Sequence, residues 1–516
     1  MVISTEIDMK INVIEYLQET VKNYPDKIGF EDASISLSFK QFNFYAQNIS
    51  TNICNLTSSI QKPIGIFLPK SVNALVAFMG VLYSGNIYMP LDVKNPPERL
   101  TGILNHIQPE FIITDKANAS KLEQVSYNCK ILIFEEIITD IENIKFRYDK
   151  LIDTDGAYII NTSGSTGVPK GVLISHKSII DYIEWATECY NIKDTEIIGN
   201  QAPFYFDNSV LDIYLTLKNG CKLVITPESL FIFPIKLMEY FRGKNINMFF
   251  FVPSILVNIA NMDILKTCKP NFTKILFAGE VMPTKQLNYW IKYYPEALFS
   301  NLYGPTEITV DCTYYTVDRK FEDNESLPIG KKCRNSDVII LNDKDEEIIK
   351  PNESGELCVR GTSLALGYYN DFEKTNKVFT QNPLNKHYPE RIYRTGDMVY
   401  YNERGEIIFQ GRKDFQIKHM GYRIELGEIE TALGTIEALK NVCVVYDQIN
   451  SKIVLFYESN IEITSRDLVL SLGKIIPKYM IPSDLRKIDK LPINANGKID
   501  RLKLKAMINE SELCKA

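Results

Sequence analysis

Residues 158–171 read Tyr-Ile-Ile-Asn-Thr-Ser-Gly-Ser-Thr-Gly-Val-Pro-Lys-Gly, and an apolar strand-like run, Val172–Ser175, follows them. Glycines tolerate positive φ and carry no side chain, so the backbone N–H groups of such a loop can converge on an anion. Further donors stand among the glycines, and the candidate set is Thr162, Ser163, Gly164, Ser165, Thr166, Gly167 and Lys170. The stretch predicts a polyphosphate cradle, although an ordinary flexible connection has a similar composition. It is not a Walker A loop, because it runs from strand to strand and Pro169 precedes the lysine.

Length and composition restrict the class of protein. The 516 residues are 45% hydrophobic and 24% charged, which suits a globular chain with two or more domains. The net charge of −6 argues against a nucleic-acid binder. Ten cysteines without paired spacing and only four histidines argue against zinc and favour free thiols. The sequence shows neither a signal peptide nor an apolar run of about 18 residues, so a cytoplasmic location is expected.

Strand and helix signals alternate along most of the chain, which is typical of α/β layers with largely parallel sheets. The character changes near Asp414. Residues 415–516 combine a basic strand–turn stretch, a helix at 425–433, strands at 442–446 and 452–457, and a helix near 464–474. We therefore predict a large α/β domain over residues 1–413 and a small α+β domain over residues 414–516.

Phe206-Asp207-Asn208 places an acid in an aromatic and aliphatic setting. A buried carboxylate is costly unless a cation pairs with it, so Asp207 points to a cationic partner. The alternative interpretation is that Asp207 caps the helix that follows it.

Two strand-like runs end in glycine turns, at Gly279 and in Asn301-Leu302-Tyr303-Gly304-Pro305-Thr306-Glu307. Ligands bind at strand ends of α/β sheets. Tyr303 offers a flat face for a base, Thr306 a hydroxyl and Glu307 a carboxylate for a metal ion. Downstream, Asp397 and Arg412 could bond ribose hydroxyls or each other.

These blocks, occurring in this order with Asn496-Gly497-Lys498-Ile499-Asp500-Arg501 near the end, resemble the acyl-adenylating superfamily. Within it the chain is most similar to amino-acid-activating enzymes of nonribosomal peptide synthesis and to D-alanine–D-alanyl carrier protein ligases. The resemblance implies a large N-terminal domain of α/β layers with a distorted β-barrel. It also implies a small mobile C-terminal domain that swings about a hinge at Asp414.

The resemblance implies a role for each matching residue. ATP would contact the glycine loop, Gly279, residues 301–306, Asp397, Phe409 and Arg412. Glu307 would bind Mg²⁺, a hard ion suited to carboxylate oxygens. Lys498 would bridge the substrate carboxylate and the α-phosphate, where charge concentrates in the transition state. Thr306, Glu307 and Lys498 are the expected catalytic residues, and Gly421 would line the path of the attacking thiol.

By the same correspondence, Asp207 would pair with the ammonium of an amino acid. The side-chain pocket would consist of Asn208, Leu211, Phe250, Leu276, Ala278, Leu302, Val310 and Asp311. Its bulky members favour a small substrate such as alanine, β-alanine, glycine or serine. Asp311, if it faces the pocket, favours a hydroxyl or amine on the substrate. D-alanyl carrier ligases carry cysteine where this chain has Ala278.

The implied reaction is amino acid plus ATP giving aminoacyl-AMP and pyrophosphate, followed by transfer to the phosphopantetheine thiol of a carrier protein. The sequence has no Gly-Gly-x-Ser-like carrier site after Lys498, so the carrier is expected to be a separate protein. The basic stretch from Lys413 to Arg423 could meet an acidic carrier, a phosphate or solvent. The rival classes are an acyl-CoA synthetase, whose acid substrate has no ammonium for Asp207, and an inactive adenylate-binding module.

Overall fold

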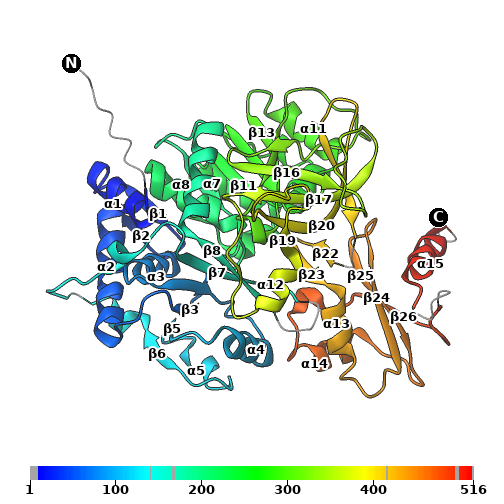
Figure 1. Ribbon diagram of the computed structural model, residues 1–516, viewed down its shortest axis with the longest axis horizontal. Coiled ribbons are helices and arrows are strands. Elements are labelled where there is room, and N and C mark those ends of the chain that lie inside the picture. The colour runs from blue at the N-terminus through cyan, green and yellow to red at the C-terminus, as the bar shows by residue number, and fades with distance from the viewer. Residues whose placement is uncertain (1–9, 140, 165–168, 414–415, 494–498, 514–516) are drawn as a thin grey trace.

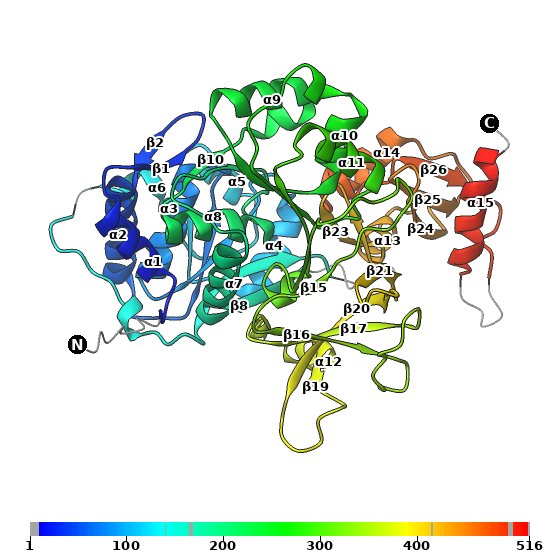
Figure 2. The ribbon, with the colours of Figure 1, turned by 90° about the horizontal axis from the view of Figure 1, so that it is seen from above.

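The computed structural model describes residues 10–139, 141–164, 169–413, 416–493 and 499–513. Two mixed, largely parallel sheets and their helices form the first part of the chain, and antiparallel strands follow (Figure 1). The last part, coloured orange to red, lies at one end of the long axis in both ribbon views (Figure 2). The predicted fold class, a large α/β part followed by a small α+β part, is confirmed.

The long sheet has most of its strands parallel, with antiparallel strands at both edges. In spatial order its strands are β15 (Lys331–Lys332), β14 (Thr313–Thr316), β13 (Leu298–Tyr303), β12 (Lys274–Ala278), β11 (Met248–Phe251), β9 (Ile197–Asn200), β10 (Lys222–Ile225), β1 (Ile28–Glu31) and β2 (Ser36–Ser38). The second sheet has the order β18 (Gly367–Tyr368), β8 (Lys170–Ser175), β7 (Gly156–Thr162), β4 (Ile87–Pro90), β3 (Pro63–Phe67), β5 (Phe111–Thr114) and β6 (Lys130–Ile133). Such fully buried parallel strands suit their apolar sequences, for example Met-Phe-Phe-Phe in β11.

Helices cover these sheets and fill the space between them. They are α1 (Ile14–Asn23), α2 (Phe39–Leu56), α3 (Val72–Tyr83), α4 (Pro97–Ile107), α5 (Ala119–Leu122), α6 (Phe134–Ile137), α7 (His176–Cys189), α8 (Asn208–Asn219), α9 (Pro234–Gly243), α10 (Pro253–Asn261) and α11 (Thr284–Tyr293). Serine caps begin several of them: Ser38 forms a capping box for α2, and Ser71 caps α3. Nearly every residue of α3 is buried, as expected of a helix that is apolar on all sides.

A third, antiparallel sheet stands where the resemblance implied a barrel. It contains β16 (Ser336–Leu341), β17 (Ser354–Gly361), β20 (Arg391–Tyr401), β19 (Phe379–Gln381) and β21 (Ile407–Arg412), with α12 (Phe372–Val378) beside it. The C-terminal part then consists of the hairpin β22–β23 (Gln416–His419 and Tyr422–Glu425), α13 (Leu426–Leu433), β24 (Asn441–Asp447), β25 (Lys452–Glu458), α14 (Ser465–Leu472), β26 (Asp484–Lys487) and α15 (Arg501–Leu513).

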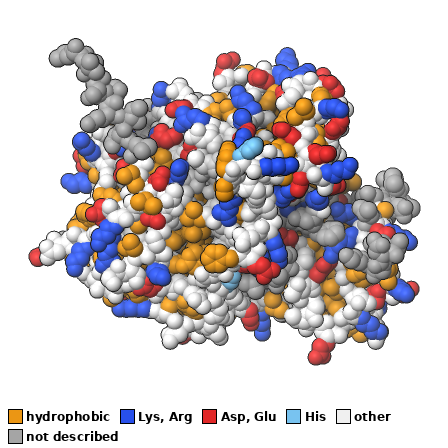
Figure 3. Space-filling model, in the orientation of Figure 1, with side chains coloured by type: hydrophobic (Ala, Val, Ile, Leu, Met, Phe, Trp, Pro, Cys, Tyr) orange, Lys and Arg blue, Asp and Glu red, His pale blue; other side chains and the backbone are white. Residues whose placement is uncertain are grey.

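The predicted domain boundary falls between β21 and β22. Its expected hinge residue, Asp414, lies outside the described residues. Acidic and basic side chains are interspersed on the face shown in Figure 3, in line with the modest net charge. Among the described residues, the structure contains no helix with the length and apolar character needed to cross a membrane.

Candidate active site

A cleft lies at the carboxyl ends of β7, β12 and β13, where α/β sheets bind ligands. The cleft brings together many of the predicted residues from distant parts of the chain. Those in its wall are Thr162, Ser163, Asp207, Asn208, Ala278, Gly279, Gly304, Pro305, Thr306, Asp311, Asp397, Arg412 and Gly421. The space that remains is about 100 Å³. Small-molecule sites usually measure about 300–1,000 Å³, so the cleft is nearly closed in this arrangement.

Asp207 lies at the start of α8 but does not cap it. It occupies the N-cap position with an αR backbone, and its side chain accepts no hydrogen bond from the helix. The Thr306 hydroxyl donates to the carboxylate instead, and no ion pair of Asp207 occurs among the described residues. Burial raises its pKa, and Thr306 and the Lys418 ammonium only partly oppose this. The helix-cap alternative is therefore wrong, and Asp207 faces the cleft as a carboxylate in need of a cation.

Position 304 requires a glycine, because the turn after Thr306 brings a second segment of backbone against it. A Cβ on Gly304 would lie 2.3 Å from the carbonyl oxygen of Val310 and 2.6 Å from the Cα of Asp311. Val310 itself has φ +70°, an outlier for a β-branched residue. Such strain is retained where the surrounding structure fixes it, often at a functional site. Here the close approach of the two backbone segments places Asp311 in the cleft wall.

Asp311 joins Asp207 as a second acid of the cleft. Its Oδ2 accepts a hydrogen bond of 2.6 Å from the hydroxyl of Tyr182 on α7. Burial raises the pKa of Asp311 to about 8; Tyr182 opposes the shift, and the charge of Asp207 adds to it. At neutral pH the group is therefore mostly protonated, and it can both donate and accept a hydrogen bond. No signal in the sequence indicates Tyr182. It lies on α7, far from Asp311 along the chain, and no local pattern links the two residues.

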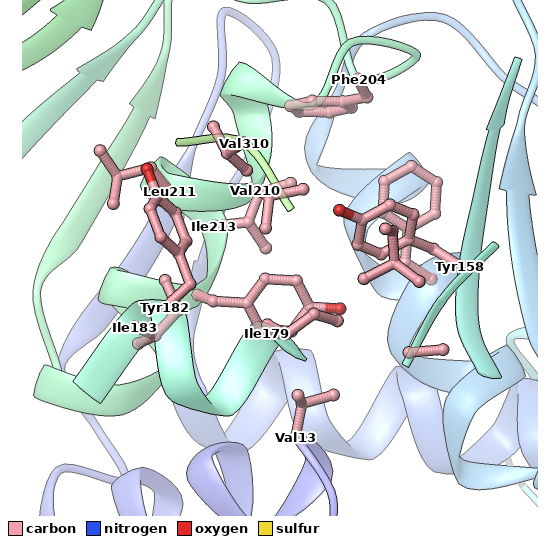
Figure 4. Packing of buried hydrophobic residues seen from close by; sticks show 14 of the residues in the cluster. Val13, Tyr158, Ile179, Tyr182, Ile183, Phe204, Val210, Leu211, Ile213 and Val310 are labelled. Atoms are coloured by element: carbon pink, nitrogen blue, oxygen red, sulfur yellow. The ribbon is translucent and has the colours of Figure 1, made fainter. Parts of the chain in front are cut away.

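The bulky residues of the predicted side-chain pocket lie behind its wall. The buried set comprises Leu211, Phe250, Leu276, Leu302 and Val310, all in the main hydrophobic core. Figure 4 shows Leu211, Val310, Ile213 and Tyr182 among the buried residues of this core. The smaller or polar members, Asn208, Ala278 and Asp311, line the space itself. Asn208 Nδ2 is buried and has no hydrogen-bond partner among the described residues.

The residues predicted to hold the nucleoside contact one another. Arg412 Nη1 pairs with Asp397 Oδ1 at 2.8 Å, and the Tyr303 hydroxyl donates to Asp397 Oδ2. The Phe409 ring lies 6.2 Å from the Tyr303 ring. Asn301 donates its amide to the Pro328 carbonyl, so it stands behind the cleft wall. Of the two alternatives for Asp397 and Arg412, the structure has them bonded to each other.

The described part of the glycine loop carries neutral side-chain donors and a lysine ammonium. Thr162 Oγ1 and both polar atoms of the Asn161 side chain are buried without a partner among the described residues. Lys170 Nζ lies 4.8 Å from the centre of the Tyr368 ring and 3.9 Å from Glu307 Oε1, and burial lowers its pKa. Ser165, Thr166 and Gly167 lie outside the described residues, as does Lys498.

Glu307, the predicted Mg²⁺ ligand, is fully buried and already bonded. Its Oε2 pairs with Arg423 at 2.6 Å, and its Oε1 accepts a 2.8 Å hydrogen bond from Tyr368. Burial opposes ionisation, but Arg423 and Lys170 outweigh it and lower the pKa of Glu307 to about 2. Within the described ranges, no three His, Cys, Asp or Glu side chains group as metal ligands would. In this arrangement the residues present do not fit a metal ion.

The β22–β23 hairpin reaches into the cleft from the C-terminal part. Its two-residue turn, Met420 and Gly421, has φ of +52° and +81°, as a type I′ turn requires. Gly421 donates its N–H to Glu280 Oε1 at 2.8 Å, and a Cβ there would lie 2.9 Å from Val252 Cγ1. Gly421 is thus held against the strand ends, and its role beside the path of the thiol stays a prediction.

Lys418, on the same hairpin, points into the cleft. Its Nζ lies 5.8 Å from the centre of the Tyr303 ring, and its accessible surface faces the cleft wall. Enclosure lowers its pKa, while Asp397 and Asp207 favour its charged form. The basic stretch from Lys413 to Arg423 therefore lies in two environments. Lys418 and Arg423 line the cleft, whereas Lys413 lies on the outer surface and pairs with Asp343 at 2.9 Å.

Two more contacts join the C-terminal part to the cleft, and neither had a sequence signal. Arg99 of α4 forms an ion pair with Glu428 of α13, and both side chains are almost fully buried. Tyr422 stacks on Tyr479 at 3.6 Å between ring centres and meets Phe206 edge-on at 5.0 Å. The hairpin is thereby anchored beside the segment that carries Asp207.

Comparison with known proteins places this geometry in a family. A family model described as AMP-binding enzyme matches residues 17–369. Zwittermicin A synthase ZmaJ of Bacillus cereus is 31% identical over 96% of this chain and 94% of its own length. A D-alanine–D-alanyl carrier protein ligase of Listeria innocua is 31% identical over 97% of this chain and its own full length. The solved structure of an o-succinylbenzoate CoA synthetase from Bacillus subtilis superposes with TM-score 0.84 at 17% identity, over 96% of this chain and 98% of that one.

Proposed function

The chain belongs to the AMP-binding enzyme family, and from that premise we propose that it activates a small amino acid with ATP as an aminoacyl-AMP. It then passes the aminoacyl group to the phosphopantetheine thiol of a separate carrier protein. The fold by itself does not choose between amino acids and other acids, because a CoA synthetase shares it. The name of one 31%-identical relative, a D-alanine–D-alanyl carrier protein ligase, supports the amino-acid and carrier branches.

The observation that carries the proposal is the state of Asp207. It is a buried carboxylate in the cleft wall, its pKa is raised, and no described cation pairs with it. An amino acid supplies the missing ammonium, whereas a fatty or aryl acid does not. With the ammonium at Asp207, the substrate carboxylate is proposed to point toward the predicted nucleotide residues. Lys498 is proposed to approach there from the C-terminal domain during adenylation.

We assign a role to each residue of the cleft within this proposal. Asp207 is proposed to hold the ammonium end, Asp397 and Arg412 to bind ribose hydroxyls, and Thr162 and Lys170 to bind the phosphates; all but Lys170 line the cleft. In the first step the carboxylate oxygen bonds to the α-phosphorus and pyrophosphate leaves. In the second step a thiol sulfur bonds to the acyl carbon, the thiol proton is lost to solvent and AMP leaves. Mg²⁺ is proposed as the metal that accompanies ATP.

The substrate side chain is proposed to be short and to carry a hydroxyl or an amine. Leu211 and Val310 are buried in the hydrophobic core behind the cleft wall, and the space that remains in the cleft is about 100 Å³, which favours a short chain. Asp311, protonated and held by Tyr182, presents a hydrogen-bonding group in the cleft wall. Serine and short diamino acids satisfy both conditions, while glycine and alanine satisfy only the first.

ATP–pyrophosphate exchange with a panel of D-, L- and β-amino acids tests the proposal. We expect exchange with small amino acids and the highest kcat/KM for one with a side-chain donor. Asp311→Ala should lower kcat/KM for that substrate more than for alanine. Exchange supported by fatty or aryl acids and by no amino acid would contradict the proposed function.

A further inference from the structure

A second cavity lies beside the active cleft, at the carboxyl ends of β3, β4 and β10. It measures about 380 Å³, which is within the usual range of about 300–1,000 Å³ for small-molecule sites. Pro90, Leu91, Asp92 and Tyr205 line both spaces, so the two are neighbours. None of the described residues predicted to hold ATP or the amino acid lines the second cavity, and the proposed function therefore leaves it without a role.

Lys70 lines this cavity and has no counter-ion among the described residues. It stands between β3 and Ser71, the cap of α3. Its Nζ donates to the carbonyl oxygens of Gln201 at 2.8 Å and Asn200 at 3.2 Å, and no carboxylate of a described residue lies within ion-pair distance of it. An ammonium has three donors, so the two carbonyls leave one donor unused and the charge uncompensated within the described part of the chain.

Three acidic side chains line the same cavity, and each already has a partner. Glu228 forms an ion pair with Lys94, and both side chains are largely exposed to solvent. Asp92 accepts a hydrogen bond from the Lys94 N–H at 2.9 Å, and Asp32 accepts one from the first N–H of α3 at 2.8 Å. These three acids would repel a multiply charged anion such as phosphate, whereas a single negative charge matches the ammonium.

The rest of the lining is mainly apolar. Its buried members come from β3, α3, β10 and the segment before α8, and they are Ile66, Leu68, Phe78, Phe204 and Ile225. A ligand that places an apolar group against these side chains gains free energy by removing apolar surface from water. The cavity thus offers one positive charge at one place and an apolar surface elsewhere.

Enclosure makes the charge of Lys70 costly. Burial lowers the pKa of Lys70 to about 7, although Glu228 and Asp212 favour its charged form; Lys94 opposes that form. A carboxylate in contact with the ammonium would offset this cost, because buried charges are stable when they are paired. We propose that the second cavity is a binding site for a small monocarboxylate with an apolar body, whose carboxylate pairs with Lys70. The apolar body lies against the side chains named above.

Lysine labelling of the native protein with acetic anhydride tests the site, and mass spectrometry reads each lysine separately. The probe is sodium benzoate, with its neutral analogue benzamide and inorganic phosphate as comparisons. Benzoate at ten times its Kd should slow acetylation of Lys70 about tenfold, since only about a tenth of the sites then stay free. Benzamide and phosphate should protect Lys70 far less. Lys62, an exposed residue that does not line the cavity, is the internal control and should be labelled equally in all samples.

Titration calorimetry with benzoate tests the role of the charge. Because the pKa of Lys70 is about 7, about three quarters of this side chain is neutral at pH 7.5 and must take up a proton when a carboxylate binds. Measurements in two buffers of different ionisation enthalpy should therefore show uptake of about 0.75 proton per benzoate at pH 7.5 and about 0.1 at pH 6. Affinity should fall about 15-fold between pH 7 and pH 8.5. A pH-independent affinity without proton uptake would contradict pairing with Lys70.

Substitution of Lys70 separates this site from the active cleft. Lys70→Met should abolish benzoate binding and Lys70→Arg should retain part of it, with the folding of each variant verified by circular dichroism. Lys62→Met is the matched control and should bind benzoate as the native protein does. Benzoate binding that survives Lys70→Met would place the ligand elsewhere and overturn the inference.

The labelling result decides alone if Lys70→Met does not fold, because it uses the native protein. Unchanged acetylation of Lys70 at the highest soluble benzoate concentration would overturn the inference. Equal protection by benzamide or by phosphate would overturn the recognition of a single negative charge. Neither measurement involves ATP or an amino acid, so failure of this inference and failure of the proposed function can be told apart.

Discussion

Replacing Asp207 with asparagine should weaken amino-acid binding and, in the free protein, raise stability. Asparagine keeps the size of the side chain and an acceptor for the Thr306 hydroxyl, and it removes the charge. The raised pKa of Asp207 means that the fold disfavours its ionised form. Most point mutations of buried groups are destabilising, so a gain in stability would be a specific sign of an unpaired carboxylate.

The size of the binding loss follows from the charge pair. Removing one partner of a buried charge pair costs about 2–5 kcal/mol, and a retained neutral hydrogen bond places Asp207→Asn near the lower end, at about 2–3 kcal/mol. That corresponds to an increase of about 30- to 150-fold in KM for the amino acid at a tenfold change per 1.4 kcal/mol. KM for ATP should change far less, because the predicted nucleotide contacts lie on other strand ends.

The assay is ATP–pyrophosphate exchange with each substrate varied in turn, combined with thermal unfolding of the free protein at several pH values. The gain in melting temperature should be present at pH 7.5 and shrink as the pH falls into the range where an ordinary aspartic acid is protonated. Asp212→Asn is the matched control: Asp212 is buried on the same helix with a pKa of about 8, bonds Asn200 and does not line the cleft. Equal increases in KM for both substrates, or a lower melting temperature without a binding effect, would refute the reasoning.

The remaining predictions concern catalysis, packing and pH. Lys498→Ala should abolish most adenylation and leave transfer from preformed aminoacyl-AMP largely intact; equal loss in both half-reactions would contradict the proposed role. Gly304→Ala should destabilise the protein by about 1–3 kcal/mol and weaken amino-acid binding, since its Cβ would lie 2.3 Å from the Val310 oxygen. Its control, Gly102→Ala in α4, meets nothing within 4 Å and should be neutral or stabilising in urea unfolding. The buried His176 has its pKa lowered to about 3, so the stability that its neutral form confers is complete above pH 6.5 and is lost as the pH falls. Between pH 7 and pH 5 the loss should be about 2 kcal/mol at 1.36 kcal/mol per pKa unit, and His176→Asn should flatten this dependence in urea titrations. If His176→Asn lost as much stability between pH 7 and pH 5 as the native protein, His176 would not be the cause of the pH dependence.

Local patterns were sufficient for much of the site because each strand of a parallel sheet delivers its loop to the same edge. Thr162, Gly279 and Thr306 each follow a strand signal, so their meeting at one cleft could be predicted. The bulkiness of Leu211 could also be read as a limit on pocket depth. The partner of Asp207 could not be predicted. Its two possible roles, pairing with a cation and capping the following helix, were separated only by the helix geometry at Asn208.

Contacts between distant segments had no local signal. Tyr182 reaches Asp311 across 129 residues, and Arg99 reaches Glu428 across 329. Lys418 and Arg423 read equally well as surface charges, because a short hairpin exposes one face to solvent unless another part of the chain covers it. Their place in the cleft wall depends on where the C-terminal part sits, which is a property of the tertiary structure.

Local periodicity and turn chemistry are enough to predict the family blocks, the alternation of strands and helices, and the side chains at the strand ends. Which of these groups are bonded to each other and which lack a partner became clear from the folded arrangement. Glu307 has its cation in Arg423, while Asp207 has none among the described residues. The physical reason is that the electrostatic cost of a buried charge is set by every group around it, and those groups come from all parts of the chain.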